Sequence, residues 1–238
     1  MSQTNARTRT WAWSVPRLRE AGPRARHERR AYLAAKRSVD LVLASLTLVL
    51  LIPLMALVAV LVRLTSPGPA LFRQPRVGRD GRLFTMLKFR TMTDGCSDEL
   101  HRDYVRQLLS NNASGSAASG RLFKLANDPR WTPIGRFLRR TSIDELPQLF
   151  NVLRGDMSLV GPRPVLPWEA ELLHDTYAAR FNVSQGITGL WQTSGRSALT
   201  MRQALGLDLE YVARCGLLLD LGILFKTVLV VVRPGDAE

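Results

Sequence analysis

Cysteine and histidine are scarce in this chain of 238 residues. It has two cysteines, Cys96 and Cys215, and three histidines, with no Cys-x-x-Cys pair and no histidine-rich segment. A disulfide framework is therefore excluded, and a zinc site is disfavoured, because both need clustered ligands. Two isolated thiols indicate a reducing compartment.

Acidic residues are also few. The chain carries 20 Asp and Glu against 33 Lys and Arg, which gives a formal net charge of +13. Such an excess favours polyanionic partners: phosphates, anionic lipid headgroups or nucleic acid. Hydrophobic residues make up 46% of the chain. This excludes global disorder and leaves room for one sizeable domain or two small ones.

The positive charge is concentrated near the N-terminus, where residues 1–40 contain ten Lys and Arg against three Asp and Glu. Residues 1–30 lack apolar periodicity and are predicted to form a mobile basic arm. Two interpretations of this arm stay open. It is a solvated tail without function, or it contacts the anionic cytoplasmic leaflet, where each basic residue contributes about 1 kcal/mol.

An uncharged apolar run extends from Leu41 to Val62. At about 1.5 Å per residue it is long enough to cross a hydrocarbon core of about 30 Å. Lys and Arg flank both ends, however, and both ends therefore favour the cytoplasmic side. Because Pro53 removes a helical hydrogen bond within the run, we expect a re-entrant helix hairpin at about residues 39–63. A kinked spanning helix and a buried helix of a soluble protein are the alternatives.

The chain after Thr65, residues 66–238, is predicted to be a globular part, because two prolines and a glycine at 67–69 end the membrane segment. Alternating apolar residues on both sides of Gly78–Gly81 predict an antiparallel β-hairpin with strands at 71–77 and 83–89. Residues 97–110 are typical of a helix, and 110–120 of a flexible loop. The basic residues of the hairpin segment are expected to face phosphate or headgroups; they are Arg73, Arg76, Arg82, Lys88 and Arg90.

A second helix is predicted between Asp144 and Gly155. Proline is tolerated in a helix only in the first turn, so Pro147 requires a start close to Asp144, and Gly155 is a typical stop. The expected apolar face consists of Leu146, Leu149, Phe150 and Leu153. Near the C-terminus, Gly216–Val232 is interrupted by charge and indicates an amphipathic helix or a packed strand.

The pair Asp144 and Glu145 suits phosphate chemistry. A carboxylate at a helix N-terminus stays ionised and can act as a nucleophile or metal ligand, and Mg²⁺ beside a diphosphate takes one or two carboxylates. Guanidinium groups nearby can hold phosphate oxygens; they belong to Arg136, Arg139, Arg140, Arg154 and Arg163. The plain alternative is an N-cap beside a first-turn charge, on a solvated cationic face.

Four segments carry a resemblance to a known family. They are KRSVDLVLASLTLVLLIPLMALVAVLV, SPGPALFRQPRVGRDGRLFTMLKFRTM, IGRFLRRTSIDELPQLFNVLRGDMSLVGPRP and GITGLWQTSGRS. Together they closely resemble the bacterial sugar transferases, monotopic phosphoglycosyl transferases that act on polyprenol phosphate. The likeness runs from about Lys36 to Val232, and residues 31–238 are therefore expected to form one such domain, in its minimal catalytic form.

The resemblance implies a two-step reaction. An aspartate attacks the sugar-linked phosphate of a UDP-sugar and releases UMP, and undecaprenyl phosphate then takes the phosphosugar from the enzyme. By match of motif, Asp144 is the nucleophile and Glu145 is associated with Mg²⁺. The substrate phosphates are assigned to Lys88, Arg90, Arg139, Arg163 and Arg196. The family also implies a bacterial inner membrane location with the catalytic domain on the cytoplasmic side, a homodimer, and no nucleic acid partner.

One departure concerns Ile52, because the family often has serine before this proline, and the hydroxyl that could satisfy the broken backbone is missing here. The fold class expected is α-rich α+β, with a re-entrant membrane helix hairpin and a helical cytoplasmic domain that carries a short β-hairpin. A competing hypothesis is a non-enzymatic, membrane-anchored binder of polyanions. Such a protein would lose affinity steeply with salt and be indifferent to Asp144.

Overall fold

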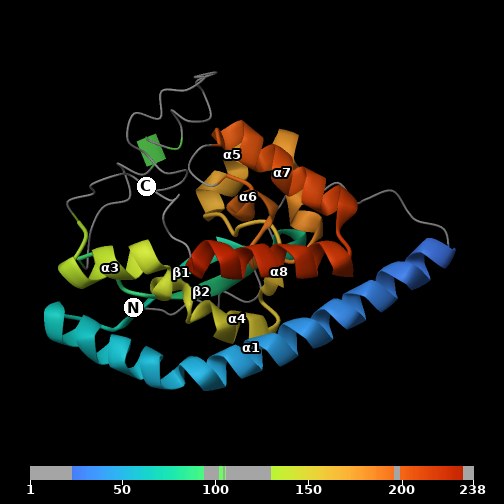
Figure 1. Ribbon diagram of the computed structural model, residues 1–238. Coiled ribbons are helices and arrows are strands. Elements are labelled where there is room, and N and C mark those ends of the chain that lie inside the picture. Colours follow the sequence, from blue (N-terminus) through green and yellow to red (C-terminus); the bar gives the residue numbers. More distant parts are fainter. Residues whose placement is uncertain (1–22, 94–101, 104, 106–129, 196–198, 233–238) are drawn as a thin grey trace.

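A single long helix, α1 (Pro23–Thr65), runs along one side of the rest of the chain (Figure 1). In this computed structural model the described residues are 23–93, 102, 103, 105, 130–195 and 199–232. Residues 1–22 of the expected basic arm lie outside them. Residues 23–30, which the composition also assigned to the arm, instead form the beginning of α1.

The apolar run of α1 has one packed stripe and a wide exposed face. The residues of the stripe recur every three to seven positions and are buried: Ala44, Leu48, Met55, Val58 and Val62. On the opposite face Val49 is 72% exposed and Leu50 is 77% exposed. Only 22% of the most apolar 18-residue stretch of α1 is buried. Among the described residues, α1 is the one helix that is long and apolar enough to cross a membrane. A buried helix of a soluble protein does not have this pattern.

The structure corrects the expected break at Pro53. The helix continues through this residue, and Figure 1 shows a shallow bend, concave toward the rest of the chain, in place of two helices folded into a hairpin. Proline removes one hydrogen bond and bends a helix without ending it when the flanking turns are held. Here Leu48 and Met55, one on each side of Pro53, pack into the same core.

The predicted β-hairpin is confirmed at the predicted boundaries. Strands β1 (Leu71–Val77) and β2 (Leu83–Phe89) pair antiparallel. The short 3₁₀ turn η1 (Arg79–Gly81) joins them, with positive φ at Asp80 (56°) and Gly81 (73°). Aspartate and glycine are among the residues that tolerate this conformation best, which explains why the turn forms here.

Short helices and one further pair of strands complete the described fold, and the expectation of a helix-rich α+β chain is confirmed. Strands β3 and β4 pair in parallel. In chain order the elements are α3 (Pro133–Thr141), η2 (Ile143–Glu145), α4 (Gln148–Arg154), β3 (Ser158–Val160), α5 (Pro167–Tyr177), η3 (Ala178–Asn182), β4 (Gly186–Thr188), α6 (Leu190–Thr193), α7 (Met201–Arg214) and α8 (Leu217–Val232).

Two other sequence predictions concern helices. The C-terminal segment forms the helix α8, so the strand alternative is wrong. Of the helix expected at 97–110, residues 102, 103 and 105 are helical, and the remainder lies outside the described residues, as does the loop expected at 110–120.

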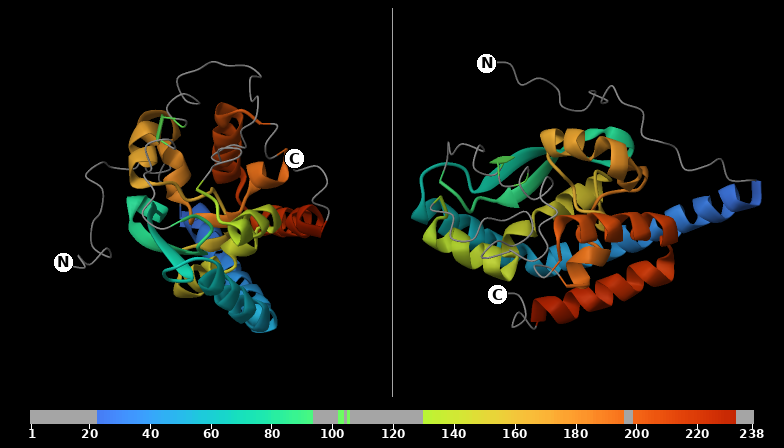
Figure 2. Two further views of the ribbon diagram at one scale, coloured as in Figure 1. Left: turned by 90° about the vertical axis from the view of Figure 1, so that its left-hand side faces the viewer. Right: turned by 90° about the horizontal axis from the view of Figure 1, so that it is seen from above.

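The rest of the chain packs against α1 and is attached to it on both sides of the apolar run. In Figure 2, the view from above shows the hairpin and α5 on one flank of α1, and α8 on the other. Just before the apolar run, Arg37 donates hydrogen bonds to the carbonyls of Val152 (2.6 Å) and Leu153 (2.9 Å) at the end of α4. Just beyond the C-terminal end, Arg90 donates to the carbonyl of Pro67 (2.6 Å).

Candidate functional site

Asp144 and Glu145 lie in the 3₁₀ turn η2, between α3 and α4. Ser142, in the left-handed conformation (φ 59°), ends α3 and turns the chain into η2. The expected helix therefore begins one turn later than predicted, at Gln148, with Pro147 as its N-cap. The proline ring and its missing N–H prevent α-helical hydrogen bonding across the dyad.

The C-terminal stop of α4 is confirmed, since Gly155 caps the helix with φ 85°. The predicted apolar face is wrong in part, because Phe150 is 37% exposed and Asn151 is fully buried. Asn151 donates to the Thr85 carbonyl (2.7 Å) and accepts from the Leu87 N–H (3.0 Å). These bonds fasten α4 to β2, and so fix the dyad relative to the strand that carries Lys88.

Glu145 binds two cationic side chains through a single carboxylate oxygen. Its Oε1 accepts from Lys88 Nζ at 2.9 Å and from Arg163 Nη2 at 3.1 Å. The three side chains are 13% to 20% exposed, so solvent screens these pairs only partly. Asp144, beside them, is 4% exposed. Two carboxylates and two cations therefore share a small, partly enclosed volume.

The surroundings shift the pKa of both cations. Burial lowers the pKa of Lys88, and the neighbouring Glu145 and Asp144 offset only part of this effect. Burial also lowers the pKa of Arg163, but the attraction and hydrogen bond of Glu145, with Asp144, outweigh it and the net pKa is raised. Arg163 is thus a permanent cation, whereas Lys88 is the titratable one.

A cavity of about 420 Å³ opens beside the dyad and is lined by both charged and apolar side chains. The charged lining residues are Glu145, Arg163, Arg139 and Arg140. Apolar side chains of α1, α4, β4, α8 and the turn before α4 also line it, namely Leu51, Leu54, Leu149, Ile187, Val231 and Leu146. Asp144 is not one of the lining residues. The cavity can hold a ligand that combines a phosphate with a hydrocarbon chain.

The structure sorts the arginines that the sequence assigned to phosphate. Arg139 and Arg163 line the cavity, and the Arg139 guanidinium lies 5.2 Å from the centroid of the Trp131 ring. Arg136 and Arg154 are exposed and do not line it. Arg196 lies outside the described residues.

Arg90 also lies away from the cavity. Its side chain is buried, and its guanidinium donates to the carbonyls of Ser66 and Pro67 and to the Ser66 hydroxyl, at 2.6 to 2.9 Å. It does not line the cavity. Since its hydrogen bonds go to the loop after α1, we assign Arg90 to structure and not to substrate phosphate.

Sequence reasoning missed several residues of the cavity wall. Thr188, Trp191, Gln192 and Thr193 all line it, and all belong to the segment GITGLWQTSGRS, from which only Arg196 was assigned. Thr47 of α1 lines it too. The missed signal was a cluster of hydroxyl, amide and indole side chains within one short segment.

The dyad fits a magnesium ion that arrives with a diphosphate. No group of three or more His, Cys, Asp or Glu able to hold a metal occurs within the described part of the chain. A protein-only metal cage is therefore absent from that part. Mg²⁺ is commonly bound by one or two carboxylates together with substrate phosphates, and Glu145 with Asp144 matches this donor set.

Comparison with known proteins identifies the family of this chain. The sequence model of the family described as bacterial sugar transferase matches residues 31–234. Undecaprenyl-phosphate galactose phosphotransferase from Salmonella typhimurium is 44% identical over 202 residues, which cover 85% of this chain and 41% of that protein. Exopolysaccharide production protein ExoY from Rhizobium meliloti is 41% identical over 194 residues, 82% of this chain and 84% of that protein.

A third relative is UDP-glucose:undecaprenyl-phosphate glucose-1-phosphate transferase from Escherichia coli, 40% identical over 201 residues, 81% of this chain and 39% of that protein. The chain thus spans less than half of the Salmonella and Escherichia relatives but most of ExoY. With a family match over most of its length and relatives above 40% identity, this chain belongs to the bacterial sugar transferase family.

Proposed function

We propose that this chain transfers a sugar 1-phosphate from a UDP-sugar to a polyprenol phosphate and releases UMP. One observation carries the proposal: Glu145 holds Lys88 and Arg163 beside Asp144, next to a cavity that both charged and apolar side chains line. A simple polyanion binder has no use for two carboxylates among its cations. The competing hypothesis of a non-enzymatic binder is therefore disfavoured.

The reaction proceeds in two displacements at one phosphorus atom. An Asp144 carboxylate oxygen bonds to the sugar-linked phosphorus, the bond from that phosphorus to the bridging oxygen breaks, and UMP leaves with the electron pair. A phosphate oxygen of the polyprenol phosphate then attacks the same phosphorus and displaces the Asp144 carboxylate. In each step one oxygen nucleophile replaces another oxygen at phosphorus: the Asp144 carboxylate replaces UMP, and the polyprenol phosphate then replaces the carboxylate. No oxidant or reductant is needed.

Lys88, Arg139 and Arg163 stabilise the negative charge that accumulates during both displacements. Arg163 provides a forked donor that suits two phosphate oxygens, while Lys88 acts as a point charge. Glu145 keeps Lys88 and Arg163 in place. Glu145, together with Asp144, would also hold Mg²⁺. When bound, the ion neutralises diphosphate charge and orients the phosphate oxygens.

The acceptor, a phosphate on a hydrocarbon chain, fits a cavity that both charged and apolar side chains line. We propose that its phosphate lies near Arg139 and Arg163, and that its prenyl chain follows the apolar wall past Leu51 and Leu54 of α1. Burial of hydrocarbon contributes about 0.8 kcal/mol per methylene. Because α1 supplies this wall and exposes apolar residues on its far side, the acceptor can enter from the bilayer without crossing water.

We also propose that α1 does not span the bilayer. The globular part holds α1 just before the apolar run through Arg37, and just beyond the C-terminal end of the helix through Arg90 and Pro67. A helix that crossed the membrane would place one of these contacts on the opposite side, with a charged domain inside the hydrocarbon. Both ends therefore lie on one side, which positive flanks make the cytoplasmic side of the bacterial inner membrane.

The names of the relatives favour glucose or galactose as the sugar. The test uses membranes that contain the protein, with undecaprenyl phosphate, Mg²⁺ and a panel of UDP-sugars, scored by UMP release. We expect one hexose donor to be accepted. The Asp144→Asn variant should release only background UMP, while the matched control Asp80→Asn, in a turn that asparagine tolerates equally, keeps wild-type activity.

A second measurement addresses the covalent step. After incubation with the accepted donor alone, mass spectrometry should find a hexose phosphate on the peptide that contains Asp144, absent from Asp144→Asn. Full UMP release by the variant would reject the nucleophile. Binding of nucleic acid or anionic lipid without UMP release from any donor would support the competing hypothesis. A homodimer remains a prediction from the family resemblance.

A further inference from the structure

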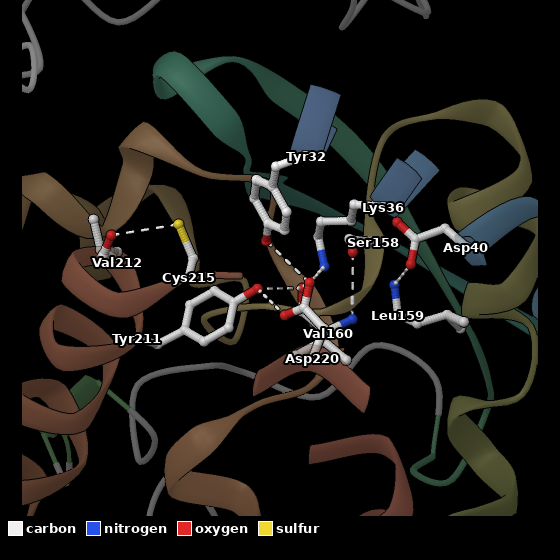
Figure 3. Close-up of polar contacts among 10 residues, drawn as sticks. All are labelled: Tyr32, Lys36, Asp40, Ser158, Leu159, Val160, Tyr211, Val212, Cys215 and Asp220. Carbon is white, nitrogen blue, oxygen red and sulfur yellow. Dashed lines mark hydrogen bonds and ion pairs between the residues drawn. The ribbon is translucent and has the colours of Figure 1, made fainter. Parts of the chain in front are cut away.

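Polar side chains from α1 and from the two C-terminal helices α7 and α8 meet in a buried cluster next to strand β3 (Figure 3). The carboxylate of Asp220 in α8 accepts from Lys36 Nζ (2.9 Å), Tyr32 OH (3.0 Å) and Tyr211 OH (2.7 Å). Lys36 and Tyr32 belong to α1, and Tyr211 belongs to α7. The side chains of Lys36 and Asp220 are 10% and 4% exposed, so the ion pair is almost fully removed from solvent.

The same cluster holds one backbone carbonyl of β3. The oxygen of Val160 accepts from Lys36 Nζ at 3.0 Å and from Tyr211 OH at 3.2 Å. Nearby, Asp40 Oδ1 accepts from the backbone N–H of Leu159 at 3.0 Å. Helix α1 therefore holds the Leu159 N–H and the Val160 C=O at the end of this strand.

The position of Val160 determines where Arg163 can lie, because only Gly161 and Pro162 separate them. The N–H of Gly161 donates to the Thr188 carbonyl at 2.9 Å, and a Cβ atom on Gly161 would come within 2.2 Å of the Ser184 carbonyl oxygen. Pro162 has a fixed φ. A displacement of Val160 is thus passed along a segment with few conformational alternatives.

Other long-range donors hold the following residues of this loop. Arg180, whose side chain is 1% exposed, donates to the Arg163 carbonyl at 2.8 Å, and Arg76 donates to the Pro164 carbonyl at 3.2 Å. The side chain of Arg163 then reaches Glu145. The backbone that carries Arg163 is thus held by cationic side chains, through the carbonyls of Val160 before it and of Arg163 and Pro164 themselves.

A buried ion pair is weak evidence for a purely stabilising role, because apolar residues of similar volume are often as stable. Its geometric specificity is the better reason to keep it. We propose that Lys36 and Asp220 are positioning residues for the transfer reaction: they set the place of Arg163 through the Val160 carbonyl and so couple the seating of α1 to the active site. This inference rests on the proposed function of the Asp144 site.

The test is a double-mutant cycle on full-length protein in membranes, with UMP release as the assay. Lys36→Met keeps the length and apolar volume of the side chain and removes its donors. We expect kcat/KM to fall at least tenfold at equal amounts of folded protein. Because this loss acts through Arg163, combining it with Arg163→Ala should cause little loss beyond that of Arg163→Ala alone.

Arg37→Met is the matched control. Arg37 is the next residue of α1 and is also hydrogen-bonded to backbone carbonyls, but those carbonyls belong to α4. Its effect on kcat/KM, whatever its size, should multiply with that of Arg163→Ala. If Lys36→Met prevents folding, Tyr211→Phe removes the hydroxyl that Asp220 and the Val160 carbonyl share and keeps the Lys36–Asp220 ion pair, and the same cycle applies to it.

The outcomes separate this inference from the proposed function. If the double variant Lys36→Met/Arg163→Ala has about the same kcat/KM as Arg163→Ala alone, the positioning role is supported. Losses that multiply, or a fall in thermal stability with unchanged kcat/KM, overturn it while the transferase activity of the wild type stands. A wild-type protein that releases no UMP from any UDP-sugar rejects the proposed function itself.

Discussion

Deprotonation of Lys88 should set an upper pH limit to the proposed transferase activity. Its ammonium lies 2.9 Å from Glu145 Oε1, and burial lowers its pKa below the ordinary lysine value of about 10.4. Once the ammonium loses its proton, the donor diphosphate loses one of its cations. We therefore expect kcat/KM for UMP release to fall as pH rises, by about tenfold per pH unit beyond this lowered pKa.

The effect on stability has the opposite sign, which separates lost chemistry from unfolding. With a folded pKa below the unfolded one, the unfolded chain binds more protons between the two values, so the contribution of Lys88 to stability grows as pH rises through that window. Activity should fall where this contribution increases. A thermal-shift series in the same buffers should then show no loss of the folded protein that parallels the loss of activity.

The decisive comparison is a pH profile of kcat/KM from pH 7 to 10.5 for wild type and Lys88→Arg. Arginine keeps its charge throughout this range, so the variant should lose the descending limb, whatever its rate at pH 7. Lys88→Met should be slow at all pH values and also lack the limb. Identical profiles for wild type and Lys88→Arg would show that Lys88 does not supply the charge in question.

Two further predictions concern buried arginines. Arg90→Met should lower the thermal midpoint, because the hydrogen bonds to the carbonyls of Ser66 and Pro67 are lost, each worth about 0.5–1.5 kcal/mol. The KM for UDP-sugar should stay at the wild-type value, and a raised KM would restore Arg90 to the phosphate site. Asp208, which binds Arg180 at 2.7 Å, has its pKa raised to about 6 by burial despite that arginine. Its contribution to stability is therefore present at low pH and declines as pH rises through about 6, and Asp208→Asn should abolish this slope in urea titrations between pH 4 and 7.

Local patterns predicted local structure well in this chain. The hairpin was predicted at its observed boundaries because the turn at Asp80 and Gly81 and the alternation on both sides are encoded within about twenty residues. The stop at Gly155 was equally local. Such features need no knowledge of the rest of the fold.

Long-range contacts were the part that local patterns could not supply. Pro53 signalled a break, but packing of both flanking turns onto one core kept α1 continuous. Lys88 and Arg90 are two residues apart, yet β2 ends at Phe89, and Arg90 turns to the loop after α1 while Lys88 faces Glu145. The pairing of Lys36 with Asp220 spans 184 positions and has no signature in either segment.

The placement of the dyad shows why such contacts decide the chemistry. From sequence, the charge of Asp144 was expected to be stabilised by the N-terminus of a helix, which no change of pH alters. In the structure α4 begins after Pro147, and both Lys88 and Arg163 interact with the dyad. Stabilisation by a lysine can be lost by deprotonation, whereas stabilisation by backbone N–H groups cannot. The descending limb predicted for Lys88 therefore follows from the one-turn displacement of α4, and it distinguishes the two arrangements in solution.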